Sequence, residues 1–165
     1  MAISYLHLRI CGRRGVDLAI FVETNKKLHL CTDGIVVCPI HPQIDSMSNY
    51  PITSIRDYYP LEYSHMMHIV KEGVGKGDVI YSDIDGHQKI LWVCCHNAYN
   101  VAYKLDWIED GLKSMAAMKL TDKGTVYFPG IGYYQEDGVD QESVLKLVYK
   151  YLNNGRFNVS FLTHY

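Results

Sequence analysis

The sequence lacks any long apolar run: its apolar runs, such as Ile35–Cys38 and Ile90–Cys95, are only the length of a β-strand. A helix that spans a membrane needs about 20 consecutive, predominantly apolar residues, so no such helix is predicted. The first residues also lack the basic start and extended apolar region of a secretory signal peptide. We therefore expect a cytoplasmic protein without a membrane partner.

An excess of one charge is missing too: 16 basic residues face 18 acidic ones, for a net charge of −2. Surfaces that bind nucleic acid neutralise phosphates with clustered Lys and Arg, so no nucleic-acid partner is predicted. With 48% hydrophobic and 21% charged residues in a length of 165, the composition is that of an ordinary globular protein. We expect a single domain over residues 1–165.

Metal-binding and disulfide patterns are scarce. The five cysteines form no Cys-x-x-Cys pair, and their odd number favours the reduced thiols of a cytosolic protein. Cys94 and Cys95 lie in an apolar run and are expected to pack in the core. The eight histidines contain no His-Glu-x-x-His motif, and His65 and His68 are expected to form a surface pair. No metal or other cofactor is predicted.

The first half of the chain has modest structural signals. Alternation predicts a weak strand at Ile3–Ile10, and β-branched runs predict strands at Val16–Val22 and Gly34–Ile40. His41–Tyr59, which contains prolines, is predicted as a loop, and Leu61–Val70 as a helix. Strands at Asp78–Ser82 and Lys89–Cys95 are expected to form a hairpin, because Asp85-Gly86 is a favoured turn dipeptide.

The second half alternates helices with strands. Apolar residues at helical spacing predict amphipathic helices over Tyr103–Lys119 and Asp140–Leu152, the second capped by Asp140. Short β-rich runs predict strands at Thr125–Phe128 and Phe157–Thr163. This βαβαβ order is typical of a parallel sheet with helices packed on it.

A glycine-containing loop, Pro129–Gly138, follows the strand that ends at Phe128. Ligands of parallel α/β sheets bind beyond the carboxyl ends of strands. Gly130 and Gly132 permit close backbone approach to an anion, and successive N–H groups there can surround phosphate oxygens. Glycines after a strand are also ordinary turn residues, so the motif alone leaves both interpretations open.

From about Gly75 to Thr163 the chain resembles a macro domain. The loop motif stands here as Phe128-Pro129-Gly130-Ile131-Gly132. The closest resemblance is to the terminal ADP-ribose protein glycohydrolase branch, which Lys89–Met115 matches without a gap. The resemblance implies an α/β three-layer sandwich, in which a mixed central sheet carries helices on both faces. It also implies ADP-ribose or a related nucleotide as ligand, and an ADP-ribosylated protein as a further partner.

The resemblance also implies roles for individual residues. The loop from Pro129 would wrap the diphosphate, and one of its tyrosines would pack on the distal ribose. A second loop would close the opposite side, and Tyr165 would stack on the adenine. The implied ligand-binding residues are Thr32, Asp33, Gly34, Ile35, Pro129, Gly130, Ile131, Gly132, Tyr133, Tyr134 and Tyr165.

Two departures from the family pattern bear on chemistry. Cys11-Gly12-Arg13 stands where the family has a Gly-Asp pair that reads adenine, and His96 stands where the glycohydrolase branch has a lysine. A histidine cannot form the Schiff base of a lysine, but it can act as a general acid or base. His96 and Asp137, or Glu136 in place of the latter, are therefore the catalytic candidates. A hydrogen-bonded strand-end histidine and a solvated turn aspartate are the structural alternatives.

Three functions stay open at this point. The chain hydrolyses an ADP-ribosyl linkage, binds the nucleotide without chemistry, or is a degenerate macro-like interaction domain without a ligand. Loss of the expected lysine and aspartate favours the second. Release or retention of the nucleotide separates the first two functions, and a calorimetric titration with ADP-ribose separates both from the third.

Overall fold

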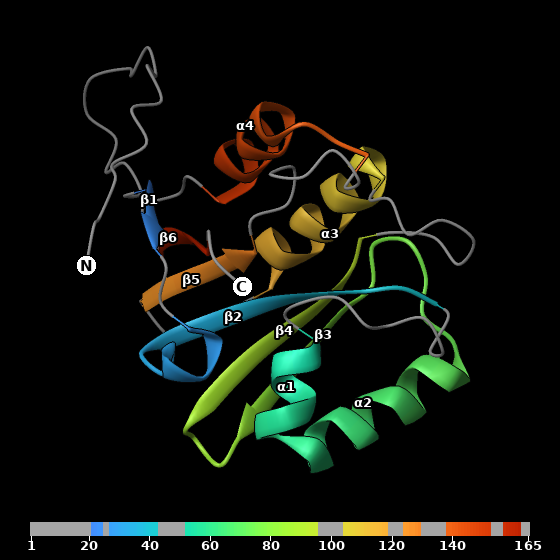
Figure 1. The fold of residues 1–165 in the computed structure, drawn as a ribbon. Coiled ribbons are helices and arrows are strands. Elements are labelled where there is room, and N and C mark those ends of the chain that lie inside the picture. Colours follow the sequence, from blue (N-terminus) through green and yellow to red (C-terminus); the bar gives the residue numbers. More distant parts are fainter. Residues whose placement is uncertain are drawn as a thin grey trace.

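A computed structural model describes residues 21–24, 27–42, 52–95, 104–118, 124–129, 138–152 and 157–162 of the chain. The described residues form one six-stranded sheet, four α-helices and a short 3-10 helix (Figure 1). In chain order these are β1 (Phe21–Thr24), η1 (Leu28–Leu30), β2 (Gly34–Ile40), α1 (Ile52–Tyr58), α2 (Pro60–Glu72), β3 (Val79–Ile84), β4 (Gln88–Cys94), α3 (Leu105–Ala117), β5 (Gly124–Pro129), α4 (Gln141–Leu152) and β6 (Phe157–Leu162).

The sheet is mixed, with strand order β1-β6-β5-β2-β4-β3. The five strands β1, β6, β5, β2 and β4 run parallel to their neighbours. At the edge of the sheet, β3 pairs antiparallel with β4. The predicted alternation of β4, α3, β5, α4 and β6 is present, but β2 lies between β4 and β5. The pairing of β2 with both strands is a long-range contact that local sequence patterns do not encode.

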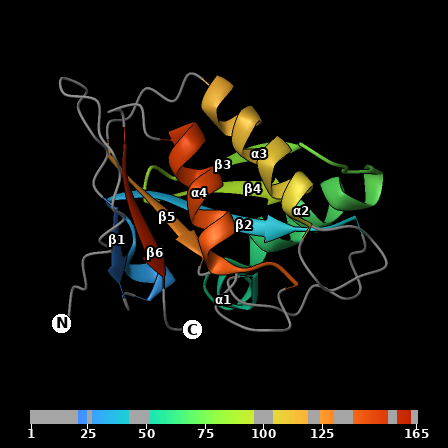
Figure 2. The same ribbon diagram turned by 90° about the horizontal axis from the view of Figure 1, so that it is seen from above.

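Helices cover both faces of the sheet, as predicted. In Figure 1 α3 and α4 lie above the sheet while α1 and α2 lie below it, and Figure 2 shows α3 and α4 side by side across the upper face. Along β2, alternate residues enter two separate cores: Val37 packs with α3 and α4, and Val36 and Cys38 pack with α1 and α2. Central strands buried on both faces read as continuous apolar runs, which explains the sequences of β2 and β4.

Most elements agree with the sequence prediction to within a few residues. The hairpin between β3 and β4 turns at Asp85 and Gly86, whose φ angles are 51° and 70°. Asp140 caps α4 as predicted: its Oδ1 accepts from the Ser143 N–H at 2.8 Å and its Oδ2 from the Ser143 hydroxyl at 2.7 Å. The predicted strand Ile3–Ile10 lies outside the described residues, as does most of Val16–Val22.

The predicted loop His41–Tyr59 is wrong over its last part, because α1 occupies Ile52–Tyr58. Two isoleucines three residues apart, Ile52 and Ile55, are fully buried in the core beneath the sheet. Tertiary packing of this short apolar stripe stabilises a helix of two turns, whose local signal is weak beside the surrounding Pro, Ser and Asn residues.

The cysteines of the described part are packing residues. Within the described residues, Cys31, Cys38, Cys94 and Cys95 are buried thiols that form no disulfide. Burial raises the pKa of Cys94 to about 12, with a contribution from the charge of Asp78. Burial also raises the pKa of Cys95 well above its usual range. The thiols of Cys94 and Cys95 are therefore protonated at neutral pH and are poor nucleophiles. Within the described ranges, no helix is both long and apolar enough to cross a membrane.

Candidate functional site

Three central strands end side by side at one edge of the sheet. The register pairs Ile40 of β2 with Cys94 of β4, and the Cys95 N–H donates to the Ile40 carbonyl at 3.1 Å. On the other side of β2, β5 runs parallel and ends at Pro129. The segments that follow β2, β4 and β5 therefore all begin at this carboxyl edge.

The connections leave this edge in opposite directions. After β2 the chain passes through α1 and α2 to β3 and β4, on one side of β2. After β5 it passes through α4 to β6, on the other side. Where adjacent parallel strands send their connections apart, the loops leave a crevice, and ligands of open α/β sheets bind there. The topology therefore places the candidate site between the ends of β2 and β5.

His41 is the residue that directly follows β2 at this edge. Its exposed fraction is 5%, which makes it one of the few buried polar residues of the described part. The sequence prediction missed it, because it assigned His41 to a loop without function. The signal was available: His41 is the first polar residue after the correctly predicted strand Gly34–Ile40, and strand ends are where site residues lie.

The start of α3 lies at the same edge. The Lys104 N–H, just before α3, donates to the Cys95 carbonyl at 3.1 Å, so the chain returns to the end of β4 before the helix begins. The amino end of α3 therefore adjoins this edge, and the dipole of a helix favours negative charge at that end.

The sheet places the predicted loop Thr32–Ile35 elsewhere. Gly34 pairs with Thr125 at the start of β5, so this loop lies at the amino edge, while Pro129 ends the same strand at the carboxyl edge. The expectation that Thr32–Ile35 faces the loop after Pro129 across one ligand therefore disagrees with the fold. Parallel strands separate their two ends by about 3.3 Å per residue, here over the whole length of β5.

Local packing explains the residues of this amino-edge turn without a ligand. A Cβ at Gly34 would overlap the carbonyl oxygen of Thr125, so glycine lets β2 approach β5. The buried Tyr127 hydroxyl donates to Asp33 Oδ1 at 2.6 Å. Burial, and then this hydrogen bond, raise the pKa of Tyr127 well above its usual value. Ile35 is a core residue and Thr32 is exposed.

Of the remaining predicted site residues, Pro129 is the one that the structure describes. Pro129 is the last residue of β5, and its position at the carboxyl edge agrees with the predicted start of a binding loop. The candidate catalytic residues and the rest of the ligand-binding set lie outside the described residues: His96, Asp137, Gly130, Ile131, Gly132, Tyr133, Tyr134 and Tyr165.

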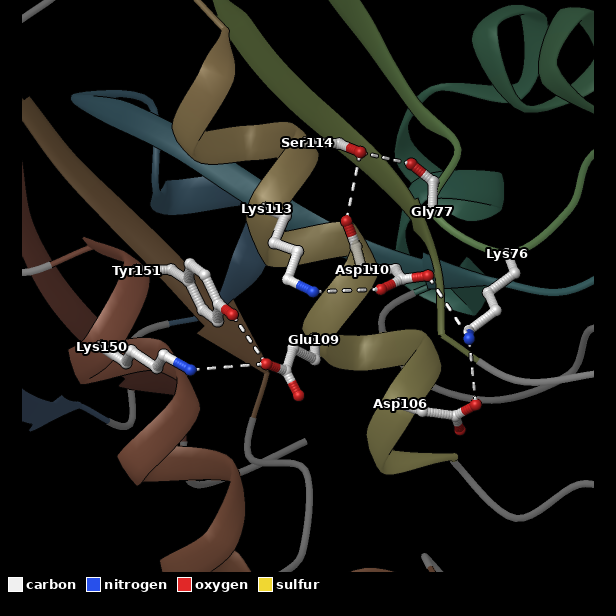
Figure 3. Close-up of polar contacts among 9 residues, drawn as sticks. All are labelled: Lys76, Gly77, Asp106, Glu109, Asp110, Lys113, Ser114, Lys150 and Tyr151. Carbon is white, nitrogen blue, oxygen red and sulfur yellow. Dashed lines mark hydrogen bonds and ion pairs between the residues drawn. The ribbon is translucent and has the colours of Figure 1, made fainter.

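The glycine-rich stretch Gly73–Gly77 is a connector between α2 and β3. The Lys76 ammonium lies 3.2 Å from Asp106 and 3.4 Å from Asp110 (Figure 3). The bond to Asp106 raises the pKa of Lys76 and lowers that of Asp106. The Ser114 hydroxyl donates to the Gly77 carbonyl at 2.7 Å. These contacts fasten the connector to α3, which explains the basic residue without a phosphate ligand.

Two other buried polar residues join helices to the sheet. The Trp92 indole N–H donates to Ser82 Oγ at 2.9 Å, and the Ser82 hydroxyl donates to Glu62 of α2 at 2.5 Å. The fully buried Gln88 donates to the Cys31 carbonyl at 3.3 Å and accepts from the Tyr59 hydroxyl at the same distance. No group of His, Cys, Asp and Glu in the described part is arranged to hold a metal ion.

Comparison with family profiles and with curated protein sequences finds no match. Solved structures are similar in fold. The macrodomain of Thermus aquaticus DarG superimposes with a TM-score of 0.73 at 13% identity, over 88% of this chain and 99% of that one. The macrodomain of Mycobacterium tuberculosis DarG gives 0.69 at 16% identity, over 86% and 97%.

A third structure, Thermosipho africanus DarTG in complex with ADP-ribose, gives a TM-score of 0.69 at 15% identity. It matches over 86% of this chain and 40% of the DarTG chain. TM-scores of this size over most of the chain show a shared fold. The resemblance stated from the sequence is thus confirmed at the level of architecture: this chain has the macrodomain fold.

Proposed function

We propose that this chain binds ADP-ribose, or a nucleotide derived from it, in the crevice between the carboxyl ends of β2 and β5. The observation that carries the proposal is the divergence of the chain after these adjacent parallel strands. The macrodomain fold supports the choice of ligand, since the Thermosipho africanus protein of the same fold is in complex with ADP-ribose.

The loop that starts at Pro129 is the proposed diphosphate-binding element. Gly130 and Gly132 allow the backbone to approach phosphate oxygens closely, and neutral N–H groups suit an anion on a protein with no basic excess. Ile131 belongs to the same loop. Tyr133 or Tyr134 would pack on the terminal ribose, and Tyr165 would stack on the adenine. Thr32–Ile35 are left out, because they lie at the amino edge.

Hydrolysis of an ADP-ribosyl linkage, with an ADP-ribosylated protein as substrate, is the finer form of the proposal. It rests on the order of the chain, since His96 comes directly after Cys95, whose N–H donates to the Ile40 carbonyl at the end of β2. His96 and Asp137 would supply the acid and the base that protonate the leaving oxygen and activate water. Binding without chemistry is the alternative, which a retained nucleotide would support.

A calorimetric titration with ADP-ribose tests the binding proposal. Gly132→Glu puts a carboxylate where the diphosphate is expected, so the affinity should fall by more than about tenfold, or roughly 1.4 kcal/mol. The matched control is Thr32→Glu, which adds the same charge to an exposed residue at the amino edge. It should leave the affinity unchanged. Equal losses in both variants, or none in Gly132→Glu, would remove the loop from the site.

Incubation with an ADP-ribosylated protein tests the finer proposal. If the nucleotide is released, His96→Ala and Asp137→Ala should each slow release by about a hundredfold or more, the usual contribution of a general acid or base. Both variants should still bind ADP-ribose. Full activity in both would assign the chemistry to other residues, and retention by the unaltered protein would assign a binding function.

A further inference from the structure

We propose that this chain forms a dimer through β3, which pairs antiparallel with β3 of a second copy about a twofold axis at Tyr81. The pairing joins the sheets of the two copies into one continuous sheet. The inference goes beyond the proposed function and is independent of it, because β4 separates this edge from the crevice between β2 and β5.

β3 is the last strand of the sheet in the part of the chain that the structure describes. Its inner side pairs with β4 along all six residues without a bulge, and no described strand lies on its outer side. Figure 2 shows β3 beyond β4, at the edge opposite β1. Natural sheets protect their edges with charged residues, prolines, bulges or very short strands. β3 has one charged residue, Asp83, so its outer edge favours the addition of another strand.

Exposed apolar side chains flank this edge. Tyr81 of β3 is 40% exposed, and Leu61 of α2, at 87%, is the most exposed large apolar residue of the described part. Glu62, which follows Leu61, accepts a hydrogen bond from the Ser82 hydroxyl, so this end of α2 adjoins β3. Successive side chains of a strand point to opposite faces, so Tyr81 lies on the face away from α2. A second copy paired with β3 would therefore cover apolar surface on both faces.

The backbone of β3 presents hydrogen-bonding groups to a partner at alternate residues. The Cys94 N–H donates to the Asp78 carbonyl at 3.0 Å, so these two residues occupy a hydrogen-bonded position of the antiparallel ladder. Hydrogen-bonded positions alternate with positions that exchange no bonds. Along the register from Asp78, the residues Val79, Tyr81 and Asp83 therefore direct their N–H and C=O groups away from β4.

Two copies of this edge fit together when these outward residues meet one another. With the axis at Tyr81, each Tyr81 lies opposite its counterpart, and Val79 lies opposite Asp83 of the second copy. All three outward residues then take part, whereas an axis at Ile80 or Ser82 aligns only two of them. An antiparallel pair of identical strands is isologous and closed, so this edge yields a dimer rather than an open fibre.

The charges of the hairpin suit a second copy in this register. A parallel pairing in register would set each aspartate against its own counterpart, and like charges directly opposite destabilise a sheet. In the antiparallel register every aspartate of the hairpin instead meets an uncharged residue. Asp78, Asp83 and Asp85 lie opposite Ile84, Val79 and Gly77 of the second copy, respectively.

Sedimentation equilibrium of charged variants tests the position of the axis. Tyr81→Lys and Tyr81→Glu should each raise the dissociation constant of the dimer by about tenfold or more, because the axis sets two like charges opposite each other. An equimolar mixture of the two variants should recover dimers, because lysine then meets glutamate. The matched control is Tyr58→Lys, the same change at an exposed tyrosine of α1, which should leave the dimer unchanged.

Oxidation of cysteine variants tests the register separately. Opposed residues at a hydrogen-bonded antiparallel position have Cα atoms about 5.5 Å apart, within the range of a disulfide. Tyr81→Cys should therefore form a linked dimer that the unaltered protein does not form. Asp83→Cys should not, because its two copies lie four residues apart along the strands, or about 13 Å.

Three results would overturn the inference. The first is an unaltered protein that stays monomeric up to about 1 mM, the weak limit of specific association. The second is a Tyr81→Lys dimer as stable as that of the unaltered protein, or a mixture of the Lys and Glu variants that recovers no dimer. The third is equal or stronger linkage through Asp83→Cys. Calorimetric titration of the unaltered protein with ADP-ribose is a separate readout, so a failure of the proposed function is distinguishable from a failure of the dimer.

Discussion

The substitution Gly34→Ala tests whether the turn before β2 has a structural role or binds the ligand. A Cβ at this position would overlap the Thr125 carbonyl oxygen and lie 3.2 Å from the Tyr127 ring. The obstacle is backbone of a central strand, so Gly34→Ala forces β2 away from β5. Overpacking of this kind costs about 1–3 kcal/mol, and the backbone obstacle places Gly34→Ala at the upper end.

Two other glycines provide an internal scale for the same change. A Cβ at Gly111 would overlap a Val93 methyl group, which is a side chain that can shift, and the helix gains about 1 kcal/mol when Ala replaces Gly. Around Gly75 a Cβ would meet nothing within 4 Å. We expect stability to fall most in Gly34→Ala, less in Gly111→Ala and not at all in Gly75→Ala.

Urea denaturation and thermal unfolding measure this order. For a protein of this length, a loss of about 2–3 kcal/mol lowers the thermal midpoint by roughly 4–12 °C. The affinity of folded Gly34→Ala for ADP-ribose should match that of the unaltered protein. A stable Gly34→Ala protein that had lost ADP-ribose binding would refute the structural reasoning and return Thr32–Ile35 to the ligand site.

Three further changes test contacts that hold the site in place. Tyr127→Phe removes the hydroxyl bonded to Asp33 and should lower the free energy of unfolding in urea by about 1 kcal/mol. Because the pKa of Tyr127 is raised in the folded state, the unaltered protein should lose stability as the pH rises above about 10, and more steeply than the variant. Parallel pH profiles of stability would contradict this. Ser82→Ala removes the acceptor of the buried Trp92 indole N–H and should lower the free energy of unfolding by about 1–3 kcal/mol. The control Ser64→Ala, on the exposed side of α2, should lower it little, and equal effects would show that the buried hydrogen bond is unimportant. Asp140→Ala removes the cap of α4 and should lower the free energy of unfolding by about 1 kcal/mol. Glu142→Ala breaks only an exposed ion pair with Lys146 and should lower it by a few tenths. Thermal unfolding followed by circular dichroism measures both, and the reverse order would contradict the prediction.

The local elements of this fold were predictable because their physical causes are local. Helical spacing of apolar residues located α3 and α4, a carboxylate located the cap of α4, and Asp85-Gly86 located the β3–β4 turn. The strand before the predicted binding loop was located in the same way, since β5 ends at Pro129, while the binding role of that loop stays a prediction.

The tertiary structure decided which ends of the strands lie together. The position of β2 between β4 and β5 depends on pairing between distant segments. This pairing places Thr32–Ile35 at the amino edge of the sheet and His41 at the carboxyl edge. Long-range packing also stabilises the helix Ile52–Tyr58, because its residues Ile52 and Ile55 are buried in the core beneath the sheet. The sequence of a strand indicates which of its side chains face each side of the sheet. The strands paired with it determine which of its two ends lies beside the ligand site.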